Sequence, residues 1–241
     1  MVKFYESTYS YDYSFPAVTL AYFLRYPNPY ATHVLSSDVI SREVEPVTGR
    51  LRTLRIHRKS SRLPPAVLKL LPKSVLGNVA GGKSESYILE TSTIDIKEGW
   101  MRTESKNLDW TGILSVVEKQ EYTRNLPASG DGGKEDYNSG AGMTGVVTTV
   151  MFRSRLGEKL RRARNGETAD DEPKKGFLAS WSTSGIQRSI EAIASRKTES
   201  QLGKAKEGMN VVLERMRGGG LVAVLEGMRR DRQLAFGSTP A

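Results

Sequence analysis

The chain has 241 residues, 38% of them hydrophobic and 26% charged, a balance that suits a globular protein with a substantial core. Its net charge of +9 predicts attraction to an anionic partner, namely nucleic acid, a membrane surface or an acidic ligand. The absence of cysteine excludes disulfides, zinc–thiolate sites and thiol catalysis, and two histidines argue against a histidine-rich metal site. No apolar run approaches the ~20 residues that span a bilayer. The first residues resemble neither a secretory signal nor a transit peptide, so structure is expected to begin at once.

In chain order, the elements predict an α+β fold. About seven segments have the alternation and composition of strands, at residues 2–13, 33–44, 51–59, 86–96, 100–108, 112–123 and 144–153. Ser14 and Pro16 predict the start of a short helix that ends near Arg25. The strands after residue 33 follow one another without helices, which indicates a mainly antiparallel sheet.

A sharp turn at Pro27-Asn28-Pro29 follows the short helix. Arg25 precedes the turn and His33 follows it, so both side chains are candidates to face the same space. In the strand at 51–59, the period of two places Arg55, His57 and Lys59 on one face. From the pattern alone, this face is either a solvated basic face or part of a site.

Residues 61–83 contain too many prolines for a strand and are unusually apolar for a loop. Either this segment packs on the core as a short helix, or it covers an apolar ligand or touches a membrane. The residues predicted for a lid or membrane contact are Leu63, Val67, Leu68, Leu70, Leu71, Val75 and Leu76.

Residues 1–217 are predicted to form one domain. Residues 127–142, rich in glycine, serine and aspartate, and residues 156–176, charged with little apolar content, are interpreted as mobile insertions. Residues 218–241, which begin with three glycines, are predicted to be a flexible tail with one weak apolar patch and a basic run.

The last predicted helix covers residues 183–216 and has a stripe that is apolar at both ends and polar in the middle. Lys197, Gln201 and Lys204 occupy that middle, where a helix that faces the core is normally apolar. Either the lysines reach water along their methylene stems, or the stripe faces a cavity with an anionic occupant, because an unpaired buried lysine is costly.

The run Arg25-Tyr26-Pro27-Asn28-Pro29-Tyr30, followed by His33-Val34-Leu35 and Arg42, resembles a motif of the PRELI-like mitochondrial lipid-transfer proteins. Further matching stretches follow in order: Leu51-Arg52-Thr53 with Arg55, Lys59 to Arg62-Leu63-Pro64, Asn107-Leu108-Asp109 with Thr111-Gly112-Ile113, and Gly208-Met209. The similarity covers nearly the whole chain apart from the two insertions and the tail, and is closest to the phosphatidic-acid branch.

This resemblance implies a curved antiparallel sheet wrapped around a long C-terminal helix, with an omega-loop lid over a lipid cavity. It implies transfer of phosphatidic acid between the outer and inner mitochondrial membranes in support of cardiolipin synthesis, without a cofactor. It also implies residence in the intermembrane space, peripheral contact with anionic membranes, and a small twin-Cys-x9-Cys helical chaperone as partner. The head-group residues it implies are Arg25, His33, Arg55, Lys59, Arg62, Lys197, Gln201 and Lys204.

Three rival hypotheses remain open. Phosphatidylserine could be the cargo, as in a sibling branch of the family. A lipid-modifying enzyme is the second, although the sequence has no Gly-x-Ser-x-Gly elbow, no P-loop and no metal-ligand cluster. A nucleic-acid binder is the third, although the basic residues are dispersed and no binding module is recognised.

Overall fold

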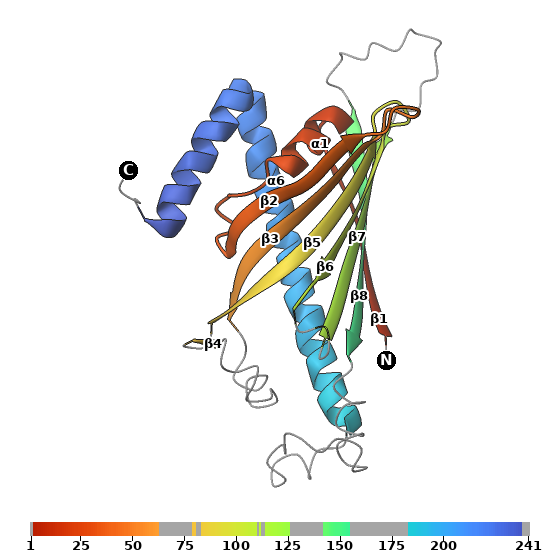
Figure 1. Ribbon diagram of the computed structural model, residues 1–241, viewed down its shortest axis with the longest axis vertical. Helices are drawn as coiled ribbons and strands as arrows, with labels where there is room; N and C mark the ends of the chain where they lie inside the picture. The colour runs from red at the N-terminus through yellow and green to blue at the C-terminus, as the bar shows by residue number, and fades with distance from the viewer. Residues whose placement is uncertain are drawn as a thin grey trace.

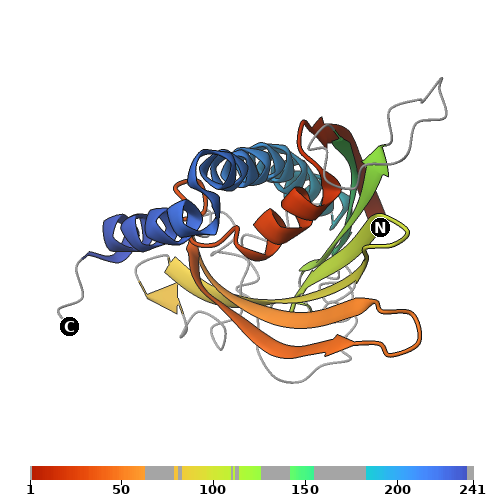
Figure 2. The same ribbon diagram turned by 90° about the horizontal axis from the view of Figure 1, so that it is seen from above.

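A computed structural model describes residues 2–62, 79–80, 83–109, 111, 114–125, 142–154 and 183–237. It confirms the predicted α+β fold, in which one sheet curves around a short and a long helix (Figures 1 and 2). The strands are β1 (Val2–Tyr11), β2 (Val34–Val44), β3 (Leu51–Arg62), β4 (Val79–Ala80), β5 (Lys83–Asp95), β6 (Trp100–Asn107), β7 (Leu114–Asn125) and β8 (Met143–Ser154). The helices are α1 (Phe15–Phe23) and α6 (Thr183–Phe236).

The sheet is antiparallel throughout the described strands, in the order β1-β8-β7-β6-β5-β3-β2, with the short β4 paired to β5. Consecutive strands lie next to each other from β2 to β8, apart from β4, and β1 closes the order by pairing with β8. Gly49 and Gly99 have positive φ values, of 71° and 73°, in the tight turns after β2 and β5. A left-handed backbone is easily reached only by glycine, so these residues set the register of the two hairpins.

The short helix α1 packs inside the curve of the sheet against α6 (Figure 2). Phe15, Val18, Ala21 and Tyr22 of α1 are buried together with Val212 and Leu213 of α6 and with strand residues. Each fully buried Val or Leu side chain contributes roughly 1.5–3 kcal/mol of transfer free energy. This cluster fixes the part of α6 around Val212 and Leu213 to the sheet, and the preceding part, from Thr198 to Ala205, borders a cavity.

The last helix differs from the sequence prediction at its C-terminal end. The predicted end near Met216 agrees with the break at Gly219 and Gly220, but residues from 221 to Phe236 are helical where a flexible tail was predicted. Gly219 and Gly220 have non-helical dihedral angles and turn the chain back on itself, and residues 221–236, here called the C-terminal arm, form a second helical segment. Glycines usually end a helix, but here the chain beyond them has an apolar residue, Val224, that is fully buried in the core.

Several predictions concern segments that lie outside the described residues. These are the predicted lid residues Leu63, Val67, Leu68, Leu70, Leu71, Val75 and Leu76, and nearly all of the predicted insertions at 127–142 and 156–176. Among the described helices, none is both long and apolar enough to cross a membrane.

Candidate functional site

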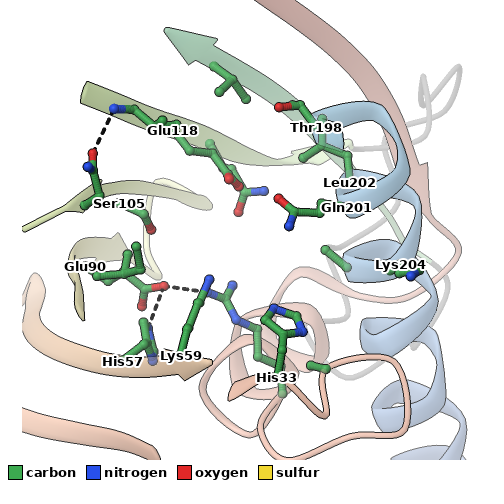
Figure 3. Close-up of a pocket in the computed structure, with 18 of the residues that line it drawn as sticks. His33, His57, Lys59, Glu90, Ser105, Glu118, Thr198, Gln201, Leu202 and Lys204 are labelled. Carbon is green, nitrogen blue, oxygen red and sulfur yellow. Dashed lines mark hydrogen bonds and ion pairs between the residues drawn. The ribbon is translucent and has the colours of Figure 1, made fainter. Parts of the chain in front are cut away.

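A cavity of about 390 Å³ lies between the concave face of the sheet and α6. Figure 3 shows side chains from β3, β5, β6 and β7 on one side of this space and Thr198, Gln201, Leu202 and Lys204 of α6 on the other. His33, from the turn before β2, completes the wall. Two parts of the chain that were predicted to face the same space therefore line one cavity. They are the turn between α1 and β2 and the polar stretch of the last helix.

A buried carboxylate, Glu90 of β5, lies in the wall of this cavity and is 1% exposed. Arg25 Nη2 donates to its Oε2 at 2.5 Å, and Arg55 donates to its Oε1 from Nε at 2.9 Å and from Nη2 at 2.5 Å. His57 Nε2 lies 3.2 Å from Oε2, a contact that becomes an ion pair only when His57 is protonated. We call these four residues the Glu90 cluster. The cluster contains two positively charged guanidinium groups and one negatively charged carboxylate, so it carries one net positive charge when His57 is neutral.

The charge states in the Glu90 cluster follow from burial and from its neighbours. Burial by itself would raise the pKa of Glu90, but Arg25, His57 and Arg55 together hold the pKa well below its usual range. Burial lowers the pKa of His57, with Arg25 and Arg55 adding to the effect against the opposing influence of Glu90. At neutral pH the cluster therefore contains an ionised glutamate and a neutral histidine.

Tyr22 holds both arginines of the cluster from the side of α1. The guanidinium carbon of Arg25 lies 3.9 Å from the Tyr22 ring centroid, and that of Arg55 lies 5.1 Å from it. Such cation–π contacts are stronger where water is excluded, and Tyr22 is fully buried. The position of Arg25 at the cavity wall is thus set by a carboxylate and an aromatic ring.

Glu118 of β7 is a second carboxylate in the wall. Burial raises its pKa, although Lys59 and Arg25 act in the opposite direction. Glu118 therefore binds its proton more tightly than an exposed glutamate does, which reduces the negative charge that the cavity presents to an anion.

The Pro27-Asn28-Pro29 turn is held in place by the side chain of Asn28, which is buried. Asn28 Nδ2 donates to the carbonyl oxygen of Arg25 at 2.5 Å, and its Oδ1 accepts from the Tyr30 amide at 2.8 Å. Gly208 of α6 packs against this amide, and a Cβ at Gly208 would lie 2.8 Å from Asn28 Nδ2. A glycine is needed at this point for α6 to approach the turn that carries Arg25.

Five of the predicted head-group residues line the cavity: Arg25, His33, Lys59, Gln201 and Lys204. Arg55 does not line it, because its side chain is 3% exposed, with Nε and Nη2 donating to Glu90 and Nη1 to the carbonyl oxygen of Phe23. The side chains of Arg62 and Lys197 lie outside the described residues. The structure thus gathers residues from the turn, from β3 and from α6, but it places Arg55 beneath the wall, and a direct contact between Arg55 and a ligand is not available in this arrangement.

The opposite part of the wall is apolar. Val116 and Phe152 are directly paired between β7 and β8, and Leu114, Val150 and Met209 also line the cavity. The cavity therefore has cationic side chains near β3 and the turn, and an apolar surface where Leu114 and Val116 of β7 lie beside Val150 and Phe152 of β8. An amphiphile with an anionic head fits both parts. Among the described residues, no group of histidine and acidic side chains could hold a metal ion.

Comparison with known proteins decides the family. A sequence profile of the PRELI-like family matches residues 16–129. Protein UPS1, mitochondrial, of Saccharomyces cerevisiae is 35% identical over 170 residues, which make up 69% of this chain and 91% of that protein. The chain belongs to the PRELI-like family.

Two further relatives are more distant or are matched over less of their length. PRELI domain-containing protein 1, mitochondrial, of Mus musculus is 34% identical over 130 residues, 54% of this chain and 56% of that protein. Protein UPS2, mitochondrial, of Saccharomyces cerevisiae is 28% identical over 122 residues, 51% of this chain and 49% of that protein. These names confirm the PRELI-like resemblance that the motifs predicted, and all three relatives are mitochondrial by name.

Glu90 and Glu118 of this PRELI-like site were missed in the sequence, and His57 was placed on a candidate basic face but left out of the predicted head-group residues. His57 shares a strand face with Arg55 and Lys59, and that alternation was a usable signal. Glu90 and Glu118 lie in strands of ordinary composition. The signal for Glu90 is its cross-strand position opposite Arg55, which requires knowledge of the β3–β5 register.

Proposed function

We propose that this PRELI-like protein is a carrier of phosphatidic acid between the outer and inner mitochondrial membranes, in support of cardiolipin synthesis. The observation that carries the proposal is that one cavity has cations in its wall, Arg25, Lys59 and Lys204, and an apolar part formed by Leu114, Val116, Val150 and Phe152 of β7 and β8. The apolar part suits acyl chains, each buried methylene of which gains about 0.8 kcal/mol.

The cationic part suits a phosphomonoester. Such a head group carries between one and two negative charges near neutral pH and has several strong acceptor oxygens. Arginine and lysine supply charge-assisted hydrogen bonds to it. Lys59 lies on β3 and Lys204 on α6, so the lysines that line the cavity come from both of its sides. In this proposal, Arg25, His33 and Gln201 complete the contacts, and Arg55 acts through Glu90.

The proposed location is the mitochondrial intermembrane space, with peripheral contact at both membranes. Its support is the membership of a family whose matched relatives are named mitochondrial. A small twin-Cys-x9-Cys helical chaperone is the proposed partner, as the family resemblance implies. Coexpression with such a chaperone, followed by size-exclusion chromatography, tests the pairing, since a stable complex elutes as one species with both chains.

A vesicle-to-vesicle transfer assay with fluorescent phosphatidic acid tests the function. Lys59→Gln and Lys204→Gln each remove a cation from the cavity wall, and we expect each to slow transfer roughly tenfold, as for the loss of one charge-assisted bond. Lys206→Gln is the matched control, since Lys206 is two residues from Lys204, stacks on Tyr9 and does not line the cavity. Equal transfer by all three variants and the unchanged protein would refute the site.

The same assay separates the alternatives. Faster transfer of phosphatidylserine than of phosphatidic acid would show that phosphatidylserine is the preferred cargo. A lipid product of changed chemical structure, detected by mass spectrometry, would show an enzyme. Salt-sensitive binding to nucleic acid that follows the number of phosphates would show a nucleic-acid binder.

A further inference from the structure

The C-terminal arm, residues 221–236, is a helix with one buried and one exposed face. Val224 is fully buried in the core cluster, Met228 packs against that cluster, and Asp231 is 6% exposed. These residues are spaced three and four apart along the helix, so they lie on one side. The arm is therefore a packed element of the fold, with its inner side already occupied.

Two contacts fix how the arm is turned. Arg215 Nη1 donates to Asp231 Oδ2 at 2.7 Å, and Arg215 Nη2 donates to Oδ1 at 3.2 Å. Gly227 lies directly against this arginine, and a Cβ there would be 2.6 Å from its guanidinium atoms. The bidentate pair and the glycine set the rotation of the arm about its axis, and the same outer face is always presented.

The outer face combines apolar and basic side chains. At 3.6 residues per turn, six residues fall within an arc of about 100°: Leu221, Val222, Leu225, Arg229, Arg232 and Phe236. The four apolar members are between 45% and 66% exposed, and both arginines are exposed. Neither acidic residue of the arm lies within the arc. Asp231 points inward to Arg215, and Glu226 falls outside the arc, past Val222 around the helix axis. We call these six residues the outer face.

We propose that the outer face docks the protein on an anionic membrane surface. A helix with large apolar side chains beside arginines lies in a lipid interface, with its apolar groups at the acyl boundary and its guanidiniums at the phosphates. The centre of a protein–protein interface is instead depleted of charge, whereas Arg229 and Arg232 lie between the apolar residues. The arm projects to one side of the molecule, away from the sheet (Figure 1). The proposal rests on the proposed function in one respect, that a lipid carrier has to reach a membrane.

Co-sedimentation of the full chain with vesicles tests the proposal. The vesicles contain phosphatidylcholine, with or without phosphatidylglycerol, which is anionic but is not the proposed cargo. We expect binding to require phosphatidylglycerol, and to weaken roughly fivefold in Arg229→Gln, as one interfacial cation contributes about that factor. Leu225→Ser is expected to weaken binding roughly tenfold through lost apolar burial.

Two substitutions on other sides of the same helix are matched controls. Arg230→Gln removes the same charge and Leu234→Ser removes an apolar side chain that is 81% exposed, but both lie outside the outer face. We expect both to bind vesicles within about twofold of the unchanged protein, since interfacial contributions fall off away from the surface. Equal losses in the controls, or no loss in Arg229→Gln and Leu225→Ser, would overturn the proposal.

Two further measurements separate this proposal from its rivals. Lys59→Gln, a cavity variant, should bind phosphatidylglycerol vesicles as the unchanged protein does, while it transfers phosphatidic acid more slowly. If the unchanged protein binds these vesicles but transfers no phosphatidic acid, the carrier function fails and the docking proposal stands. If Arg229→Gln and Leu225→Ser kept vesicle binding but lost the proposed chaperone, the outer face would be a protein interface and the docking proposal would fall.

Discussion

Arg55 and Glu90 face each other directly across β3 and β5, and Arg55 places two donors on one carboxylate oxygen, at 2.9 and 2.5 Å. The other oxygen of Glu90 accepts from Arg25, a cation that lines the cavity. The carboxylate therefore connects a residue of the ligand wall to the centre of the sheet. Arg55 holds the carboxylate in place without lining the cavity.

Glu90→Gln is expected to lower the free energy of unfolding by roughly 3–5 kcal/mol, because it leaves buried guanidiniums without a counter-charge. The double variant Arg55→Gln/Glu90→Gln should cost less than the sum of the single variants, with a coupling energy of roughly 1–3 kcal/mol. Urea denaturation measures both quantities. The exposed cross-strand pair Arg102 and Glu121 is the control, with a coupling below about 1 kcal/mol. Equal coupling in the two pairs would contradict the role given to Glu90.

The Glu90 cluster predicts a loss of stability in acid. The pKa of His57 is lowered in the folded protein, so the unfolded chain binds more protons as the pH falls below the ordinary value of 6.5. Its stabilising contribution is complete above that pH and declines below it. The lowered pKa of Glu90 adds a second decline below 4.5. Urea denaturation across this range should show the first decline flattened in His57→Gln and the second one retained. An unchanged first decline would show that His57 is not its source.

Glu118 predicts the opposite dependence on pH. Its pKa is raised in the folded protein, so the folded state binds more protons above the ordinary value of 4.5, and ionisation of Glu118 destabilises the fold as the pH rises. Glu118→Gln should therefore be more stable than the unchanged protein at neutral pH, and the difference should shrink as the pH falls toward 4.5. Thermal unfolding at several pH values measures it. A constant difference would mean that titration of Glu118 plays no part.

Gly208→Ala should destabilise the protein by roughly 1–3 kcal/mol, because the new methyl group displaces the Asn28 amide from its two hydrogen bonds. Gly203 of the same helix is the control, because no neighbouring side chain in the described part of the chain lies within 4 Å of the position that a methyl group would take there. Gly203→Ala should stabilise by up to about 1 kcal/mol through helix propensity. Chemical denaturation of both variants is decisive. Equal effects would show that α6 does not need a glycine where it meets the turn.

The sequence by itself determined much of this architecture. Alternation of side chains located the strands from β1 to β8 apart from the two-residue β4, because one face of each is buried and the period of two records it. Ser14 and Pro16 located α1, and Arg25, His33, Lys59, Gln201 and Lys204 were identified from a motif and from a polar break in an apolar stripe. These are local signals, each readable within one element.

Only the tertiary structure decided which charged side chains form buried ion pairs and which face the cavity. Arg55 looks equivalent to Lys59 along the strand, but the β3–β5 register places Glu90 opposite Arg55 and Ser86 opposite Lys59. The C-terminal arm was also decided by packing. From the sequence, Gly219 and Gly220 allow either the end of the ordered helix or a turn into a second helical segment. Burial of Val224 and the Arg215–Asp231 pair stabilise the turn. Pairs of residues that are far apart in the chain come into contact only in the folded state, so no local sequence pattern predicts them.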